Sequence, residues 1–270
     1  MDDRFHGVWG EGRALAPVIP LWQLPVLFAT ALAAGFVDAI AGGGGLITLP
    51  VFLGLGLPPA FALGTNKLQA TFGSGSAAWH YARAGAVSPR DCLRPFLLCL
   101  VGAALGSRVV EGVDPLVLKR IIPVLLLAVG GYMFFKPELG TVDTRPLLPR
   151  GWFEIGFGLG LGFYDGFFGP GTGTFWTMAY VVGQGQNLTR ATAHSKVVNF
   201  ASNLGSLAVF VAGGKVLWLA GLTMGVGQLL GARLGAGMVM SRGTRLIRPV
   251  FLTAVLAITL KVLWDAYFKR

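Results

Sequence analysis

Stretches of about 20 predominantly apolar residues recur along this 270-residue chain, and they restrict its fold more than any other feature. An α-helix needs about 20 such residues to cross the hydrocarbon core of a bilayer. Only 13% of the residues are charged and the mean hydropathy is +0.66, whereas about a quarter of the residues of a soluble domain are charged. The sequence therefore predicts an all-α, polytopic integral membrane protein. The predicted spans are 22–41, 61–81, 95–110, 117–136, 152–168, 190–212, 216–239 and 246–267.

The charge balance predicts which partners the chain has. Lys and Arg number 22 and Asp and Glu number 12, which gives a net charge of +10. Most basic residues stand between or at the ends of the apolar stretches, where basic residues set topology and meet anionic head groups. No basic strand pattern interleaved with aromatic residues is present. We therefore expect membrane lipid, and no nucleic acid, among the partners, and the sequence leaves a homodimer open.

Two further apolar stretches, 46–57 and 174–183, are too short to cross a bilayer comfortably. They follow the glycine-rich segments Gly42–Gly45 and Gly169-Pro170-Gly171. Unwound backbone at membrane depth is tolerated only where protein or a water-filled cavity covers it. Each short stretch, together with the span before it, therefore predicts a broken or re-entrant helix pair.

The second half of the chain repeats motifs of the first half in the same order, which predicts a duplicated membrane unit. The repeats are predicted at 22–137 and 152–267, with a linker at 138–151 and a tail at 1–21. Duplication with paired broken helices is typical of secondary transporters that bind substrate at the repeat interface. The paired motifs are Asp38 before a glycine run with Asp165 before Gly-Pro-Gly, Lys67 with Lys196, Gly102-x3-Gly106 with Gly227-x3-Gly231, and Pro123 with Pro249.

The basic residues bear on the relative orientation of the two repeats. Corresponding loops of the two halves have opposite biases of Lys and Arg, which favours an inverted topology. Lys269 and Arg270 at the terminus argue the other way. The small residues of the Gly-x3-Gly motifs predict close helix contacts.

Asp38 and Asp165 lie deep inside apolar stretches and occupy matching positions of the two repeats. A carboxylate near the bilayer centre costs several kcal/mol, so it normally faces a cavity and has a partner. One interpretation is proton coupling, because protonation removes the burial penalty. The other is a helix cap, in which each side chain accepts backbone N–H groups freed by the glycines. The two interpretations are compatible.

Lys67 and Lys196 form a second matched pair within apolar spans, and they predict a site for a small anion. Alternatively, each lysine forms an internal ion pair within its own repeat, Lys67 with Asp38 and Lys196 with Asp165. The N–H groups at the start of the short helices add a favourable field for an anion. The substrate-binding residues predicted beside the lysines are Asn66, Gln69, His194, Ser195 and Asn199, with Asn203 as a further polar neighbour and with Gly43, Gly44, Gly171 and Thr172 at the helix starts.

Other chemistry has little support in the sequence. The chain has no Gly-x4-Gly-Lys-Ser/Thr motif and no His-Glu-x-x-His motif, and it has only three histidines. Cys92 and Cys99 match neither a metal-binding pattern nor a disulfide framework. We therefore expect no cofactor, no metal and no catalytic residues, and we do not expect an enzyme.

These motifs resemble the sulfite exporter TauE/SafE family of bacterial membrane transporters. The resemblance covers residues 22–267, and it implies transport of sulfite, thiosulfate, sulfoacetate or another organosulfonate across the bacterial inner membrane by a multi-pass protein. Members of the family both export and import, so the direction does not carry over. The resemblance depends on Gly35–Gly45 (GFVDAIAGGGG), Gly64–Lys67 (GTNK), Gly166–Gly173 (GFFGPGTG), Ala193–Lys196 (AHSK) and Asn199.

Two functional hypotheses follow for the membrane protein. The first is a secondary transporter for a small anion, coupled to protons through Asp38 and Asp165 and working by alternating access. The second is a passive anion channel that uses the same lysines. Proton-independent flux that never saturates would favour the channel.

Overall fold

A computed structural model describes residues 17, 19–118, 120–121, 124 and 142–242 of the chain. The predicted tail 1–21 and the predicted spans 117–136 and 246–267 lie mostly or wholly outside these residues, as do Pro123, Pro249 and the C-terminal basic residues. Within the described residues every regular element is a helix and there is no strand. The chain is thus an all-helical protein of the polytopic membrane class that the composition predicts.

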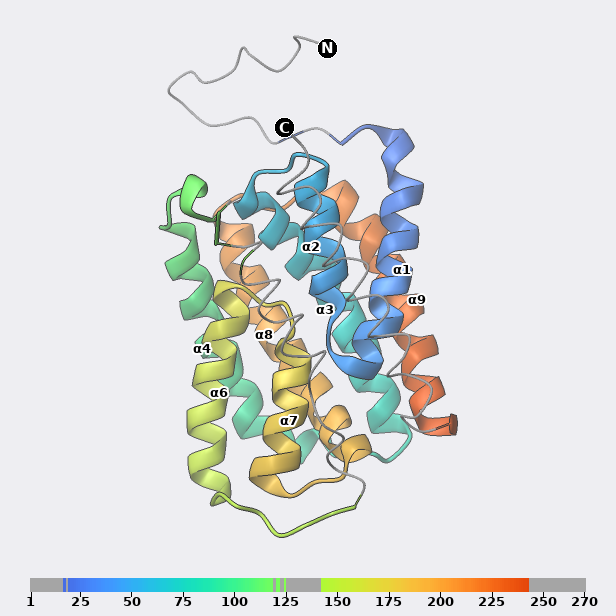
Figure 1. The fold of residues 1–270 in the computed structure, drawn as a ribbon, viewed down its shortest axis with the longest axis vertical. Coiled ribbons are helices and arrows are strands. Elements are labelled where there is room, and N and C mark those ends of the chain that lie inside the picture. The colour runs from blue at the N-terminus through green and yellow to red at the C-terminus, as the bar shows by residue number, and fades with distance from the viewer. Residues whose placement is uncertain (1–16, 18, 119, 122–123, 125–141, 243–270) are drawn as a thin grey trace.

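The helices fall into two series along the chain (Figure 1). The first series contains η1 (Leu21–Gln23), α1 (Leu24–Ala41), α2 (Gly44–Gly54), α3 (Pro59–Arg83), η2 (Pro89–Cys92) and α4 (Leu93–Glu111). The second contains α6 (Arg150–Phe167), α7 (Thr172–Gln184), α8 (Leu188–Ala212) and α9 (Trp218–Arg242). Each series has a long helix, a short helix and then two long helices. The predicted spans within the described residues therefore coincide with helices, although α6 begins at Arg150 rather than at residue 152.

Helices of one series pack mainly against helices of the other. α1 lies against α9 and α4 lies against α6, while α3 and α8 contact one another and also α9 and α4, respectively. The Gly-x3-Gly motifs allow two of these contacts, as predicted: a Cβ at Gly106 would lie 2.1 Å from the Phe163 carbonyl oxygen, and one at Gly231 would lie 2.0 Å from that of Leu32. Within the described residues the two series therefore share one bundle and contact each other through several helix pairs.

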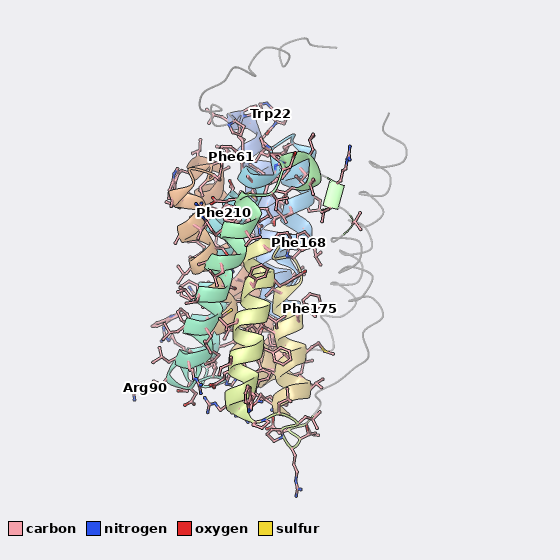
Figure 2. All side chains as sticks on the ribbon, turned by 90° about the vertical axis from the view of Figure 1, so that its left-hand side faces the viewer. Trp22, Phe61, Arg90, Phe168, Phe175 and Phe210 are labelled. Carbon is pink, nitrogen blue, oxygen red and sulfur yellow. The ribbon has the colours of Figure 1, made fainter. Side chains whose placement is uncertain are left out.

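The two series run in opposite directions through the bundle. α1 descends from the upper end of Figure 1, whereas α6 rises from the lower end. Trp22 lies at the upper end and Arg90 at the lower end in the side view (Figure 2). This arrangement is the one that an inverted duplication predicts. The duplication itself and its orientation across a membrane stay predictions.

Both glycine-rich segments interrupt a helix, as predicted from their composition. Gly42 ends α1 with a φ of 80°, and Gly171 precedes α7 with a φ of 82°, so both occupy the left-handed region that favours glycine. The two breaks touch each other about half-way along the bundle (Figure 1). A Cβ at Gly42 would lie only 2.3 Å from the Gly173 carbonyl carbon. The turns therefore bring α2 and α7 to begin at one central point.

Three helical segments of the described residues are long and apolar enough to cross a membrane: Leu21–Ala41, Arg90–Glu111 and Leu188–Ala212. Polar side chains of α3 lie inside the bundle, where Asn66, Lys67 and Gln69 are each at most 5% exposed. In contrast, leucine and valine side chains on α4 and α9 are exposed. Polar groups inside and apolar groups outside are the distribution expected of a bundle surrounded by lipid.

Candidate functional site at the two helix breaks

Lys67 on α3 forms a buried ion pair with Asp165 on α6. Its Nζ lies 2.6 Å from Oδ1 of the carboxylate, and the two side chains are 2% and 3% exposed. Gly169 in the following turn lies directly beside this pair, because a Cβ there would be 2.9 Å from the lysine Nζ. The pair therefore joins a helix of the first series to the break of the second.

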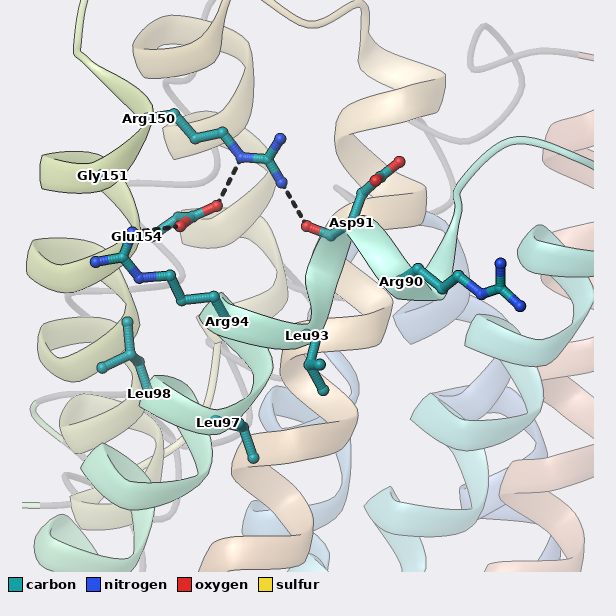
Figure 3. A pocket seen from close by; sticks show the side chains of 9 residues that line it. All are labelled: Arg90, Asp91, Leu93, Arg94, Leu97, Leu98, Arg150, Gly151 and Glu154. Carbon is teal, nitrogen blue, oxygen red and sulfur yellow. Dashed lines mark hydrogen bonds and ion pairs between the residues drawn. The ribbon is translucent and has the colours of Figure 1, made fainter.

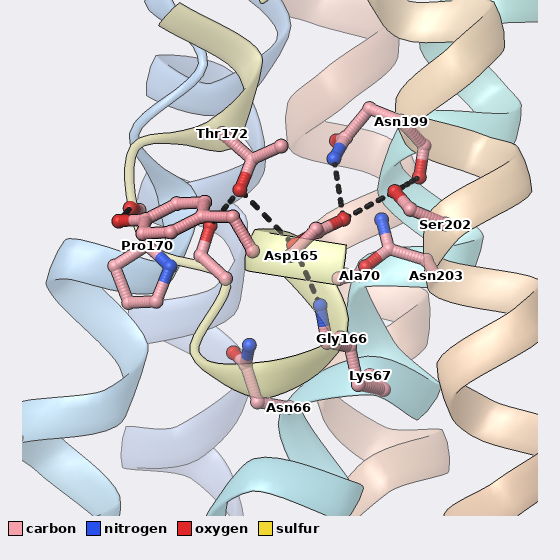
Figure 4. A network of polar contacts seen from close by, with 12 residues as sticks. Asn66, Lys67, Ala70, Asp165, Gly166, Pro170, Thr172, Asn199, Ser202 and Asn203 are labelled. Carbon is pink, nitrogen blue, oxygen red and sulfur yellow. Dashed lines mark hydrogen bonds and ion pairs between the residues drawn. The ribbon is translucent and has the colours of Figure 1, made fainter. Parts of the chain in front are cut away.

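The Asp165 carboxylate is saturated with donors (Figure 4). Asn199 on α8 donates to Oδ2 from 3.1 Å, and the Ser202 hydroxyl donates to the same oxygen. The Thr172 hydroxyl lies 3.2 Å from Oδ1 and 2.6 Å from the Gly169 carbonyl oxygen, and it shares its one proton between them. A buried carboxylate needs such partners, because an unpaired buried charge is strongly unfavourable.

Lys196 on α8 pairs with Asp38 on α1, so the pairing within each repeat that the sequence left open is wrong. The Nζ of Lys196 lies 3.0 Å from Oδ2 of Asp38, and the lysine side chain is fully buried. Each lysine is therefore paired with the carboxylate of the opposite series. This crossed pairing follows from the contact between Gly42 and Gly173, which brings the two helix breaks side by side.

Asp38 has a different environment from that of Asp165. Its side chain is 13% exposed, and its Oδ1 accepts the backbone N–H of Gly44 from 3.1 Å. Asp38 therefore caps the start of α2 across the break, as one interpretation of the sequence predicts. Asp165 instead accepts only side-chain donors among the hydrogen bonds found for the described residues. Matching positions in the two series thus have unequal surroundings.

An amide cluster continues the site on the side of α2 and α3. Oδ1 of Asn66 accepts the Thr48 hydroxyl from 2.6 Å and the Gln69 amide from 2.9 Å. The Gln69 Oε1 atom is buried without a hydrogen-bond partner, and so is Oε1 of Gln228 on α9. Unpartnered buried acceptors of this kind call for a water molecule or a ligand that donates hydrogen bonds.

A small cavity lies among these groups. Its volume is about 20 Å³, which is room for about one water molecule. Both carboxylates and one of the lysines contribute to its wall, together with glycines from both breaks. It is lined by Asp38, Gly42, Gly45, Asn66, Lys67, Ala70, Asp165, Gly169, Gly171, Gly173, Asn199, Asn203 and Gln228.

The structure brings most of the predicted site residues together. Lys67, Asn66, Asn199, Gly171, Asp38 and Asp165 line the cavity. Lys196, Gly44 and Thr172 contact the two carboxylates, Gln69 contacts Asn66, and the Ser195 hydroxyl donates to the Gly173 carbonyl oxygen from 2.7 Å. Gly43 occupies the position before α2 and does not line the cavity.

His194 lies apart from the other predicted site residues. Its Nδ1 is 2.9 Å from the Arg190 carbonyl oxygen of its own helix, and its ring lies 5.2 Å from that of Tyr180. It does not line the cavity. Successive residues of an α-helix point about 100° apart, so the side that presents Ser195 to the site turns His194 away from it.

Two polar residues of the site, Ser202 and Gln228, are absent from the predicted set. Ser202 binds Asp165, whereas Asn203, a predicted polar neighbour of the lysines, lines the cavity and donates to the Ser74 hydroxyl from 3.2 Å. Ser202 follows Asn199 by three residues on α8, and this spacing was the available signal. Gln228 is a polar residue in an apolar stretch, and the corresponding position of the first half, Ala103, is apolar.

The residues at the site are suited to electrostatics and proton transfer rather than to metal chemistry. Within the described residues, no group of three or more His, Cys, Asp and Glu side chains is placed to hold a metal ion. One ammonium group, two carboxylates and several amides line one small space, and a second ammonium group, that of Lys196, is paired with one of these carboxylates. Such a set can exchange a carboxylate for another anion, and it can accept a proton.

Comparison with known proteins places the chain among membrane transporters. The sequence model described as "Sulfite exporter TauE/SafE" matches residues 27–262. A "Probable membrane transporter protein" of Haemophilus influenzae is 47% identical over 242 residues, which are 90% of this chain and 95% of that protein. The "Probable membrane transporter protein YfcA" of Escherichia coli K12 is 44% identical over 255 residues, 94% of both chains. No solved structure matches. The chain belongs to the sulfite exporter TauE/SafE family.

Proposed function

We propose that the protein is a proton-coupled secondary transporter that moves a small sulfur-containing anion across the bacterial inner membrane by alternating access. The substrate class is sulfite, thiosulfate, sulfoacetate or another organosulfonate. The observation that carries the proposal is the crossed pairing of the buried charges. Each buried lysine forms an ion pair with the carboxylate of the opposite series, beside a central polar cavity.

The ion pairs supply a chemical reason for coupling. A substrate anion can bind Lys67 or Lys196 only by replacing the carboxylate that neutralises it. The displaced carboxylate would then be a buried charge without a partner, which is strongly unfavourable. Protonation of that carboxylate removes its charge, so the anion and the proton enter the site together.

Asp38 is the better candidate for the residue that takes up the proton. Its carboxylate accepts one ammonium and one backbone N–H, and its side chain is 13% exposed. Asp165 is 3% exposed and holds donors on both oxygens. Asp38 therefore has the easier route to water and is the first of the two carboxylates to be protonated.

The size of the cavity bears on how the substrate enters. A space of about 20 Å³ holds about one water molecule, whereas sulfite has four heavy atoms. We take the described arrangement to be an occluded one, in which the broken helices of both series close over the site. Movement of one series against the other would separate Gly42 from Gly173 and would open the site to one side at a time.

The test is uptake into proteoliposomes that contain the purified protein. Radiolabelled sulfite and thiosulfate are offered with and without an imposed pH gradient, and protein-free liposomes give the background. We expect saturable uptake that rises when the gradient is imposed. Saturable uptake indifferent to the gradient would remove the proton from the proposal. Proton-independent flux that never saturates would instead identify a passive anion channel, and the absence of flux for the whole substrate class would refute transport of these anions.

A further inference from the structure

A second pocket, a groove, lies on the outside of the bundle, away from the central cavity (Figure 3). It has a volume of about 750 Å³ and is formed by η2, the first turns of α4 and the start of α6. It lies at the lower end of the molecule, where Figure 2 labels Arg90. Arginines line one part of it and leucines line the other.

The polar part is lined by Arg90, Asp91, Arg94, Arg150 and Glu154, and two of its arginines lie beside the buried Glu154 carboxylate. Glu154 has a side chain that is only 7% exposed, and it lies 2.7 Å from Arg150 Nε and 3.6 Å from Arg94 Nη1. Arg150 also donates from Nη2 to the Asp91 carbonyl oxygen at 2.6 Å. Two hydrogen bonds therefore hold the Arg150 guanidinium, and the Arg94 guanidinium lies beside the same carboxylate.

Both guanidinium groups keep N–H groups available to a ligand. The Arg94 and Arg150 side chains are 61% and 63% exposed. A guanidinium has five N–H donors in a rigid fork, and Arg150 donates one to Glu154 and one to the Asp91 carbonyl oxygen, while Arg94 is only in ion-pair contact with Glu154. Two neighbouring arginines with further donors match the oxygens of a phosphate, which arginine binds in a bidentate manner.

The apolar part of the groove continues as a strip along α4. Leu93 and Leu97 line the groove and are 60% and 53% exposed. Val101, Leu105 and Val109 follow at intervals of four residues and are 49%, 56% and 50% exposed. This strip runs from the arginines toward the other end of the bundle. A ligand that fits both parts has an anionic head and an apolar tail.

The position of the groove agrees with a lipid at the membrane surface. Trp152, which follows Arg150 by two residues in α6, is 74% exposed. Tryptophan is enriched at the level of lipid head groups. Arg83, Arg145 and Arg190 also stand at helix ends or in the linker at this end of the bundle. Basic residues concentrate on the cytoplasmic side of membrane proteins, and the cytoplasmic leaflet contains anionic lipids.

We infer that this groove is a binding site for an anionic phospholipid of the cytoplasmic leaflet, with its phosphate on Arg94 and Arg150 and an acyl chain along the α4 strip. The inference does not depend on the substrate of the central site. The lipid would bridge the outer surfaces of α4 and α6. Asp165 is on α6, and the Gly-x3-Gly motif that contacts α6 is on α4.

The test compares lipid binding to the purified full-length protein by native mass spectrometry. Phosphatidylglycerol and phosphatidylcholine with the same acyl chains are added in turn. We expect the wild type to prefer phosphatidylglycerol, and Arg94→Gln to reduce that preference about fivefold, since one arginine near an anionic lipid surface contributes about that factor. Arg83→Gln is the matched control, because Arg83 is at the same end but does not line the groove.

Further variants separate the alternatives. Arg94→Gln leaves Glu154 paired with Arg150, and an unchanged melting temperature in neutral detergent checks that the variant folds. Leu97→Asn should lower the binding of both lipids equally, because it alters only the tail contact. An equal affinity of the wild type for both lipids would overturn the inference, as would a preference that Arg94→Gln leaves intact.

Two other occupants of the groove are outcomes of the same experiments. Thermal stabilisation by glycerol phosphate as large as that by phosphatidylglycerol would assign the groove to a free anion. Loss of a dimer in Leu97→Asn, without any change in lipid binding, would assign the strip to contact between two copies of the chain. Either result would refute the lipid site.

Discussion

Lys67 and Asp165 are separated by 98 residues in the chain, yet their charged atoms lie 2.6 Å apart in the interior of the bundle. The second pair, Lys196 with Asp38, spans 158 residues and has the same crossed arrangement. Both pairs are therefore buried ionic contacts between the two series of helices. They are also the groups that an anion and a proton would have to engage.

Removal of one charge from the Lys67–Asp165 pair should destabilise the protein strongly. Asp165→Asn leaves a buried ammonium without a counter-ion, and such a loss costs about 3–5 kcal/mol. Thermal unfolding in detergent would show a large drop in melting temperature for this variant, and the double variant Lys67→Met/Asp165→Asn should recover part of it. Arg190→Gln is the control: the side chains of Arg190 and its partner Asp143 are 54% and 50% exposed, and such exposed pairs contribute about 1 kcal/mol or less. A drop no larger than that of the control would show that the buried pair is not a structural tie.

Loss of either lysine should abolish anion uptake. Lys67→Ala and Lys196→Ala each remove the positive charge that would hold the substrate, while the carboxylate that remains keeps its neutral donors. Because Lys67→Ala leaves the buried Asp165 carboxylate without its ammonium partner, uptake is normalised to the amount of folded protein recovered, and we expect neither variant to transport the anion in the proteoliposome assay. Normal uptake by both variants would show that the lysines are structural and that the substrate binds elsewhere.

Asp38→Asn and Asp165→Asn should differ in their effect on pH dependence. Asp38 is the more exposed carboxylate and has fewer partners, so its amide variant should retain uptake with a flattened pH profile. The Asp165 variant should lose uptake at every pH, because Lys67 then lacks its counter-ion. The measurement is the initial rate of uptake across a series of external pH values. An unaltered profile in Asp38→Asn would limit Asp38 to its capping role at Gly44.

The contact between the helix breaks should tolerate no side chain at Gly42. Alanine there would adopt a left-handed conformation, which costs about 1–3 kcal/mol, and its Cβ would lie 2.3 Å from the Gly173 carbonyl carbon. We expect Gly42→Ala to lose folded protein and uptake. Gly45→Ala in the same glycine run is the control, because its nearest neighbour would be Pro170 Cα at an ordinary 3.4 Å. Size-exclusion profiles in detergent distinguish the two, and equal behaviour of both would contradict the close approach of the breaks.

The linker should be attached to the bundle in a pH-dependent manner through Asp143. Its Oδ1 accepts the backbone N–H of Asn187 from 2.6 Å, and Arg190 lies 3.3 Å from Oδ2. The Asn187 N–H, followed by the charge of Arg190, lowers the pKa of Asp143 below its ordinary value.

A lowered pKa means that the carboxylate stabilises the folded protein at neutral pH and loses this effect as pH falls through the folded-state value. The advantage of the wild type over Asp143→Asn in melting temperature should thus be present at neutral pH and should vanish in acid. A constant difference across this range would show that the charge of Asp143 has no part in holding the linker.

The helices were predictable because their signals are local. Apolar stretches set the positions of α1, α3, α4, α6, α8 and α9 to within a few residues, and the glycines at Gly42 and Gly171 marked both breaks. The matched motifs also singled out the two lysines and the two carboxylates as one group. These predictions depend only on which residues stand near one another in the chain.

The choice of ion-pair partners could not be predicted in the same way. The sequence supports the pairing of Lys67 with Asp38 and with Asp165 equally. Matched motifs show which positions of the two halves correspond, but they do not show which side chains contact each other in the folded protein. The contact between Gly42 and Gly173 decides the choice. Gln228 lines the cavity but was not predicted, because it has no polar counterpart in the first half. His194 was predicted as a site residue, but its position on α8 turns it away from the cavity.

The crossed ion pairs have a consequence for how such a molecule could have arisen. In this geometry neither half satisfies its own buried charges, since each borrows a counter-ion from the other. Under the predicted inverted duplication, an ancestor with a single copy of the unit would have needed a second, oppositely oriented copy beside it before either could be stable in a bilayer. Fusion of two such genes would then have made permanent an association that charge neutrality already required.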